Sequence, residues 1–156
     1  MDVAAMAGRC PRSRPLGLAR LMRHRLAVMH EGWLTATRDA GANVEGVLWD
    51  VALADMRALD RYEGLSEGLY AKAAQPVMVA GGAKRALVYF GANAGPGVAR
   101  PDYIAGVLAA ARGWGLSAVS VARLERFAAQ AGAPAGQTSA EPRLVRPRYA
   151  SPLDRP

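Results

Sequence analysis

Apolar and polar residues alternate along the first third of the chain, which is the pattern of half-buried strands. Residues 16–29 carry apolar side chains on both faces of an extended segment, so we expect a strand there. The stretches 30–32 and 40–43 contain glycine and are expected to form turns, which leaves a short strand at 33–38 between them. Residues 44–51, VEGVLWDV, alternate most clearly and predict the next strand.

The spacing of apolar residues then changes from two to three. Leucine, methionine and tyrosine recur three residues apart over 53–62, which predicts a short amphipathic helix. Gly64 is expected to end it, because glycine adopts the left-handed backbone conformation without steric cost. Two more helices are predicted at 101–114, which begins with proline, and at 117–131, where Ser117 can cap the first turn.

Between these helical segments the sequence predicts a β-hairpin. Its strands are residues 69–80 and 85–91, and the pair Gly81–Gly82 is expected to supply positive φ at the turn. The order of elements indicates an α+β fold with a mainly antiparallel sheet. We assign residues 1–132 to this domain and predict that 133–156, rich in proline and arginine, form a mostly disordered tail.

The positive charge is concentrated in the flanks of the chain. The net charge is +7, yet residues 26–132 hold ten basic and ten acidic side chains. Residues 1–25 hold six arginines against one aspartate, and residues 133–156 hold four against two acids. A solvated basic flank therefore explains the charge better than a specific nucleic-acid site, which stays an alternative that salt-dependent binding would reveal.

Several common classes of site are absent from the sequence. Cys10 is the only cysteine, so no internal disulfide can form, and with His24 and His30 it lacks the spacing of a zinc site. The glycine-rich run at 91–97 lacks the Lys-Ser/Thr of a P-loop and is better explained as a turn. With neither an apolar signal segment nor a membrane-length apolar run, the predicted location is the cytoplasm.

One pair of carboxylates remains as candidate chemistry. Asp60 and Glu63 lie three residues apart at the end of the predicted helix 53–62, so their side chains can approach each other. Because Gly64 stops the helix directly after Glu63, that carboxylate is expected at the mouth of the following loop. An apolar wall and a second acid would raise its pKa toward the range suited to proton transfer. Such a pair taken alone is more often solvated surface.

The string VEGVLWDVALADMRALDRYEGLSEGLY resembles the centre of the gamma-glutamylcyclotransferase family, also called the AIG2-like or BtrG-like fold. The family combines a Gly-Val-Leu/Val-Trp/Tyr strand with the string Leu-Asp-x-x-Glu-Gly and a later aromatic residue. Here these are residues 46–49, residues 59–64 and Tyr70. The resemblance continues through Tyr89 to the helix start at Tyr103, and covers most of the chain.

The resemblance implies a small mixed, mainly antiparallel barrel-like sheet and an enzyme that cyclises a gamma-glutamyl group to 5-oxoproline, releasing an amino acid or amine. The resemblance also implies that the reaction is of the transferase or lyase type, acts on a small-molecule substrate and needs no metal or organic cofactor. Carried over by position, Glu63 would be the general acid/base. Tyr103 would bind substrate, with a half-buried tyrosine at a helix start as the equal alternative. Tyr70 and Tyr89 would line the substrate site as wall or core residues.

One family feature is missing. Family members open with a strand ending in Tyr-Gly-Ser-Asn, whose backbone amides hold the anionic group of the substrate, and this string does not occur here. Residues 1–6 instead resemble the helix that follows that loop. Either the coding start lies upstream or this member lacks the loop. In the second case we expect impaired activity, about a hundred- to thousandfold per lost donor, or a non-catalytic binding protein of the same fold.

Overall fold

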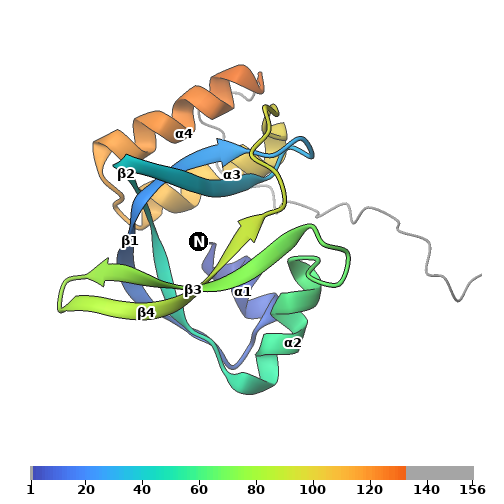
Figure 1. The fold of residues 1–156 in the computed structure, drawn as a ribbon, viewed down its shortest axis with the longest axis vertical. Helices are drawn as coiled ribbons and strands as arrows, with labels where there is room; N and C mark the ends of the chain where they lie inside the picture. The colour runs from blue at the N-terminus through green and yellow to red at the C-terminus, as the bar shows by residue number, and fades with distance from the viewer. Residues whose placement is uncertain (1, 133–156) are drawn as a thin grey trace, which may run out of the picture.

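A computed structural model describes residues 2–132 and shows a sheet of four antiparallel strands in the order β2-β1-β3-β4, with four helices around it (Figure 1). The strands are β1 (Arg14–Val28), β2 (Leu34–Asp50), β3 (Tyr70–Val79) and β4 (Gly82–Gly91). The helices are α1 (Val3–Arg9), α2 (Leu53–Tyr62), α3 (Pro101–Gly113) and α4 (Ala118–Gln130). The α+β class, the short helix before the candidate loop and the two later helices are confirmed. The predicted tail at 133–156 lies outside the described residues.

A bulge divides β1 into two halves with different burial patterns. Ala19 and Leu21 are buried before it, whereas His24 is buried directly after it and both Ala27 and Val28 are buried at the end of the strand. The register with β2 shifts between Met22 and His24, and the intervening Arg23 has a φ of 58°. An inserted residue turns every following side chain to the other face of a strand. The bulge therefore explains why the alternation over residues 16–29 is imperfect.

The turn predicted at 40–43 is wrong. Residues 34–50 form the single long strand β2, and the two short strands expected on either side are its halves. Residues 39–42 have no partner opposite them in β1, because the register passes from the pair His24–Arg38 directly to the pair Met22–Asn43. The glycine in this stretch marks a bend at a bulge instead of a chain reversal.

The sheet is antiparallel in all its described pairings and is not closed into a barrel. The β3–β4 hairpin forms as predicted, although of the two glycines at its turn only Gly82 has a positive φ, of 109°. The hairpin joins the β1–β2 pair through one residue pair, Arg20 with Met78. The expected mixed and barrel-like character is thus refined to an open antiparallel sheet whose two ribbons diverge from a narrow junction.

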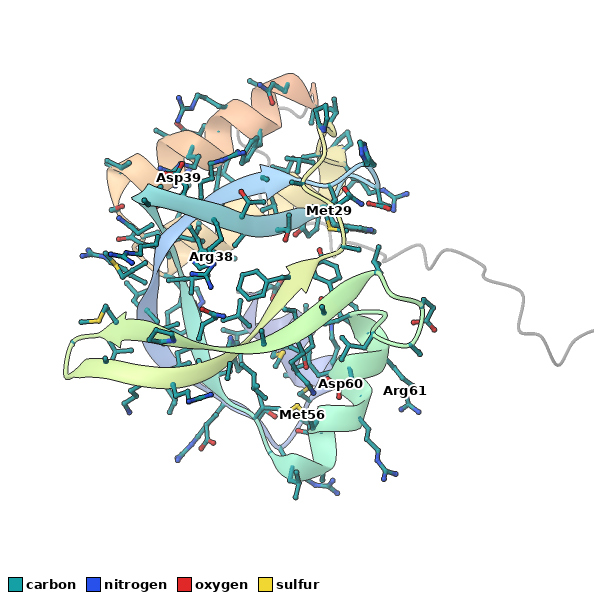
Figure 2. All side chains as sticks on the ribbon, in the orientation of Figure 1. Met29, Arg38, Asp39, Met56, Asp60 and Arg61 are labelled. Carbon is teal, nitrogen blue, oxygen red and sulfur yellow. The ribbon has the colours of Figure 1, made fainter. Side chains whose placement is uncertain are left out.

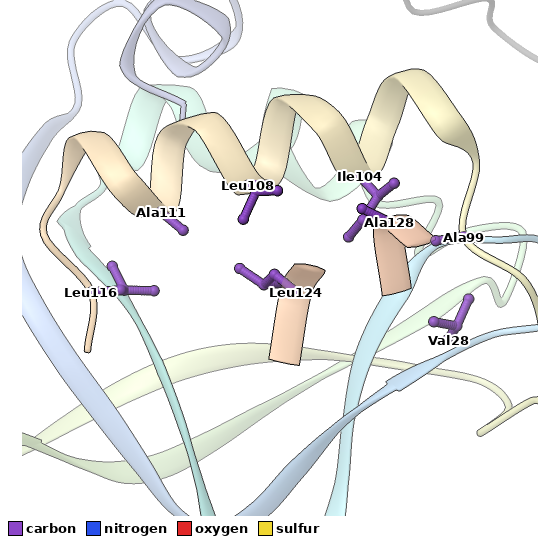
Figure 3. Packing of buried hydrophobic residues seen from close by; sticks show 8 residues of the cluster. All are labelled: Val28, Ala99, Ile104, Leu108, Ala111, Leu116, Leu124 and Ala128. Atoms are coloured by element: carbon purple, nitrogen blue, oxygen red, sulfur yellow. The ribbon is translucent and has the colours of Figure 1, made fainter. Parts of the chain in front are cut away.

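The helices pack in two separate groups. Figure 3 shows α3 and α4 burying Ile104, Leu108 and Leu124 with Val28 of β1, and this cluster is the largest apolar core. A smaller cluster forms where α1 meets α2, around Met6, Cys10 and Leu59. Its partly buried neighbours come from the end of β2 and from β4. The first group stabilises one end of the β1–β2 ribbon, and the second positions the end of α2.

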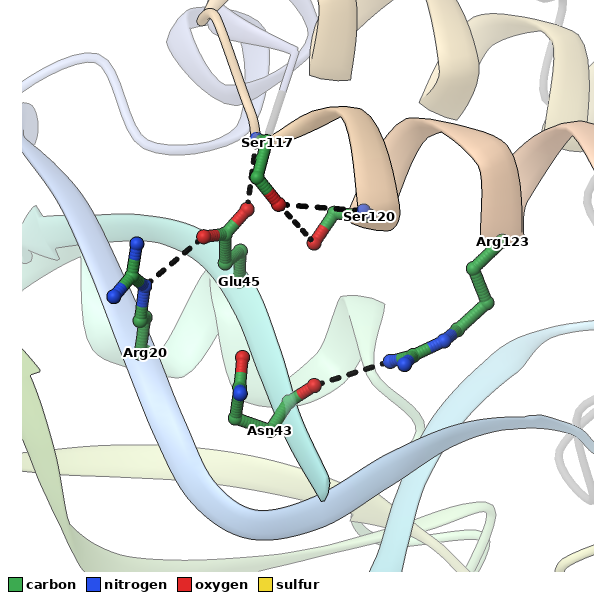
Figure 4. A network of polar contacts seen from close by, with 6 residues as sticks. All are labelled: Arg20, Asn43, Glu45, Ser117, Ser120 and Arg123. Atoms are coloured by element: carbon green, nitrogen blue, oxygen red, sulfur yellow. Dashed lines mark hydrogen bonds and ion pairs between the residues drawn. The ribbon is translucent and has the colours of Figure 1, made fainter. Parts of the chain in front are cut away.

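A buried carboxylate fixes the start of α4 against the sheet (Figure 4). Glu45 of β2 accepts a hydrogen bond from the backbone N–H of Ser117 at 2.9 Å and pairs with Arg20 at 2.9 Å. Ser117 caps α4 as predicted, since its hydroxyl accepts from the N–H of Ser120. These bonds hold the pKa of Glu45 at about 2, although burial opposes the shift. Glu45 is therefore a fixed, ionised part of the scaffold.

Candidate functional site

The end of α2 places Glu63 at a defined point. Glu63 is the C-cap residue, and Gly64 follows with a φ of 65°. The N–H of Leu65 donates to the carbonyl of Asp60, and the N–H of Gly64 donates to that of Arg61. This pair of bonds is the Schellman motif, which ends the helix and fixes the direction of the chain that leaves it. The predicted helix stop at Gly64 is confirmed.

Glu63 is half-buried, and its carboxylate accepts no hydrogen bond from the residues that the structure describes. Burial raises the pKa of its carboxyl group, because a buried carboxylate loses the water that would stabilise its charge. The positive charge of Arg9 acts in the opposite direction and lowers this pKa. A carboxyl group in this state can exchange a proton nearer to neutral pH than an exposed glutamate can.

The neighbouring acid is in the opposite situation. Asp60 accepts hydrogen bonds from the Lys72 ammonium at 2.7 and 2.8 Å and from the Tyr89 hydroxyl at 2.6 Å. The bonds from both partners, Lys72 and Tyr89, lower the pKa of Asp60, although burial opposes the shift. Figure 2 shows Asp60 and Met56 on the side of α2 that faces the sheet, whereas Arg61 points away from it.

The expected cause of the raised pKa of Glu63 therefore needs correction. Asp60 is not among the groups that shift the pKa of Glu63, which is raised by burial. Lys72 neutralises the charge of Asp60 from across the α2–β3 contact. The two acids differ because one has donors and the other does not, and such divergence is typical of carboxylate pairs with separate roles.

Two of the candidate tyrosines meet at the first residue of β2. The hydroxyl of Tyr70 donates to the backbone carbonyl of Leu34 at 2.8 Å, and the hydroxyl of Tyr103 accepts from the N–H of Leu34 at 3.4 Å. The ring of Tyr103 also packs edge-on against Trp33, with 4.9 Å between centroids. The strand β2 thus brings together side chains from β3 and α3.

The charge of Glu63 links these tyrosines to α2. Burial raises the pKa of Tyr103 to about 12, and a negative Glu63 contributes to that rise. Burial also raises the pKa values of Tyr70 and Tyr89, again with a contribution from Glu63. All three predicted tyrosines therefore lie within electrostatic reach of Glu63. The hydroxyl of Tyr89 already donates its proton to Asp60. The hydroxyl proton of Tyr103 has no acceptor among the described residues.

Sequence reasoning missed Arg9, Lys72 and Tyr62. The guanidinium of Arg9 lies 3.6 Å from the centroid of the Tyr62 ring. Arg9 is one of the six arginines of the basic flank 1–25, and no local signal separates it from its neighbours. Lys72 could have been noticed as the only lysine of a predicted strand in a chain that otherwise uses arginine almost throughout.

Two shallow hollows on the described surface lie away from this group of side chains. One is on the outer face of α4, between Val119 and Ala129, and the other is on the hairpin around Pro76. Neither is lined by Glu63 or by a candidate tyrosine. Residues 2–132 contain no cluster of His, Cys, Asp or Glu that could hold a metal ion. No helix in that range is long and apolar enough to cross a bilayer.

Comparison with known proteins agrees with the fold. The family described as "Gamma-glutamyl cyclotransferase, AIG2-like" matches residues 2–106. A solved structure of a gamma-glutamyl cyclotransferase is similar to this chain, with a TM-score of 0.72 and 21% sequence identity. The match covers 78% of this chain and 79% of that protein. An uncharacterised protein from Homo sapiens has a TM-score of 0.72 and 21% identity, covering 86% and 83%.

A third similar structure is YkqA from Bacillus subtilis, with a TM-score of 0.69 and 22% identity, covering 85% of this chain and 49% of that protein. At these identities the likeness of the structures concerns the fold. No curated protein matches the chain.

Proposed function

Because the chain belongs to the gamma-glutamyl cyclotransferase, AIG2-like family, we propose that it converts a gamma-glutamyl amino acid or amine to 5-oxoproline and a free amine, with Glu63 as general acid/base. The observation that carries this proposal is the state of Glu63. It is half-buried, accepts no hydrogen bond from the described residues and has a raised pKa. A cytoplasmic location is part of the proposal.

The reaction needs one group that moves a proton twice. The α-ammonium group of the substrate cannot attack its own γ-carbonyl until it loses a proton, and the Glu63 carboxylate accepts that proton. The free amine then forms the new C–N bond that closes the five-membered ring. The original C–N amide bond breaks as Glu63 returns the proton to the leaving nitrogen, and Glu63 then passes the second proton of the ring nitrogen to the released amine, which departs as an ammonium ion. Ring closure is intramolecular, so much of the rate comes from holding the substrate folded.

Each of the three tyrosines has a different role in this proposal. Tyr103 donates its unused hydroxyl proton to the substrate, and its pKa of about 12 keeps that proton in place at neutral pH. Tyr70 bounds the site through its bond to Leu34. Tyr89 contributes indirectly. Its hydroxyl donates a 2.6 Å hydrogen bond to Asp60 and so keeps that carboxylate away from Glu63.

The test is release of 5-oxoproline from a gamma-glutamyl dipeptide and a gamma-glutamylamine, measured by mass spectrometry. We expect Glu63→Gln to lower the rate about a hundred- to ten-thousandfold while circular dichroism stays unchanged. The matched control is Glu67→Gln, an exposed glutamate in the loop after α2, which should retain the rate. Equal turnover by the Glu63→Gln variant would exclude Glu63 as the acid/base.

A second candidate is a binding protein of the same fold without turnover. Calorimetry with the same gamma-glutamyl compounds separates the two. Binding with no release of 5-oxoproline would support the binding protein.

A further inference from the structure

Arg9 is a cation without a carboxylate partner among residues 2–132. No ion pair or hydrogen bond of its side chain occurs there, and its one close contact is with an aromatic ring. The guanidinium lies 3.6 Å from the centroid of the Tyr62 ring. Tyr62 directly precedes Glu63 in the chain, so this contact brings a positive charge to the end of α2.

The backbone around Arg9 is fixed to the same helix that carries Glu63. Asp55 of α2 is 4% exposed, and its carboxylate accepts hydrogen bonds from the N–H of Arg12 and the hydroxyl of Ser13, both at 2.9 Å. Cys10 is fully buried against Leu59 of α2. These contacts fix the turn after Arg9 against α2. The Arg9 side chain then packs on the Tyr62 ring.

We propose that Arg9 is a positioning residue, which keeps Glu63 in its carboxylate form, and that the Tyr62 ring holds the guanidinium in place for this. The inference deepens the proposed function and rests on it for its catalytic meaning. A guanidinium suits the task, because it stays charged at all working pH values and stacks on an aromatic face.

Among the described side chains that face Glu63, Arg9 is the one that counters its burial, and the amino-terminal ammonium of the chain acts in the same direction. The other side chains that face Glu63 are Tyr62 of α2, Tyr70 of β3, Tyr89 of β4 and Tyr103 of α3, all neutral at physiological pH. Lys72, the nearby ammonium, forms its bonds with Asp60. Burial raises the pKa of Glu63, and the charge of Arg9 lowers it. Glu63 therefore stays ionised, and can act as a base, at a lower pH than burial alone would allow.

The first experiment titrates Glu63 directly, which does not require turnover. The full-length chain is labelled with ¹³C in its glutamate side chains, and the Glu63 carboxyl signal is assigned from the spectrum of Glu63→Gln. We expect Arg9→Met to move the titration midpoint of Glu63 to higher pH and Arg9→Lys to return most of that shift. Arg9→Gln is the second charge-removing variant, should Arg9→Met not fold. A midpoint that does not move would overturn the proposal.

Matched variants test the geometry. Arg12→Met removes an exposed cation three residues away while keeping the backbone N–H that Asp55 binds, so the midpoint should stay at its wild-type value. Tyr62→Leu removes the ring and should raise the midpoint, whereas Tyr62→Phe keeps the ring and should not. An equal shift in Arg12→Met would show a diffuse effect of surface charge and contradict the assignment to Arg9.

The second experiment measures the pH dependence of kcat/KM for 5-oxoproline release. In Arg9→Met the acidic limb should move to higher pH, in parallel with the titration midpoint. A raised KM with an unmoved limb would make Arg9 a substrate contact and overturn the proposal. If the wild-type chain releases no 5-oxoproline, the proposed function fails, while the titration still decides whether Arg9 controls the charge of Glu63.

Discussion

Two glutamates in different regions of this molecule show opposite ways of placing a carboxylate under partial burial. Glu45, where β2 meets the start of α4, accepts hydrogen bonds from Ser117 and Arg20, and its pKa is about 2. Glu63, at the end of α2, accepts none from the described residues, and burial raises its pKa. Both carboxylates are partly buried, so burial alone does not decide whether the pKa is raised or lowered. The number of hydrogen-bond donors to each carboxylate decides it.

The difference separates a structural role from a chemical one. A carboxylate with its lone pairs occupied takes up no proton near neutral pH and stabilises the fold. A carboxylate without donors costs stability in its charged form and is available to exchange a proton. Four variants or conditions test whether the two regions differ in this way.

The largest expected effect on stability comes from Glu45→Gln. The amide cannot accept from Arg20 and from the Ser117 N–H as the carboxylate does, so we expect a loss of about 1–3 kcal/mol in the free energy of unfolding. Urea denaturation at pH 7 measures it. Glu125→Gln is the matched control, because Glu125 is half exposed in an ion pair with Arg112 and should cost under about 1 kcal/mol. Equal losses would remove the distinction between Glu45, whose side chain is 9% exposed, and the half-exposed Glu125.

The contribution of Glu45 should disappear in acid. Its pKa is lowered in the folded state, from 4.5 to about 2, so its stabilisation is present above pH 4.5 and is lost as the pH falls toward 2. The difference in unfolding free energy between the wild type and Glu45→Gln should shrink over this window. A difference that stays constant down to pH 2 would contradict the low pKa.

A smaller effect is expected from Tyr89→Phe, which removes the hydroxyl that donates to Asp60 at 2.6 Å. We expect a loss of about 0.5–1.5 kcal/mol, because Lys72 still pairs with the carboxylate. Thermal unfolding measures it. Tyr70→Phe, which removes a bond to a backbone carbonyl instead, provides the comparison for a hydroxyl with no carboxylate partner.

The smallest effect has the opposite sign. Because the pKa of Glu63 is raised in the folded state, its ionisation costs stability above the pKa of the unfolded chain. Glu63→Gln should therefore raise the midpoint of thermal unfolding at pH 7 slightly, and the gain should vanish below about pH 4. Glu67→Gln, an exposed change, should leave the midpoint where it is. A destabilised Glu63→Gln variant would show that Glu63 has a structural role.

Local patterns were enough to predict the element that carries Glu63. Apolar residues three apart predicted α2, and Gly64 predicted its end, because both depend on backbone preferences of neighbouring residues. Ser117 as the cap of α4 follows for the same reason. The family resemblance added the three tyrosines, which no spacing rule would have selected.

The bulge at Arg23 and the continuity of β2 were beyond local reasoning. A bulge depends on which residues of the partner strand lie opposite, and neither strand shows that alone. The glycine near residue 41 carries the same local signal in a turn and in a bent strand. Only the pairing of Met22 with Asn43 distinguishes them.

The sequence by itself determined where α2, α3 and α4 begin and end, and hence that a glutamate stands at the end of a short helix before a glycine. Tertiary structure alone decided the chemical state of that glutamate. Lys72 and Tyr89 reach Asp60 from two other strands, Arg9 reaches Tyr62 from another helix, and none of these contacts is encoded by neighbouring residues. A pKa depends on the charges and donors that surround a group in space, and the fold brings those from distant parts of the chain.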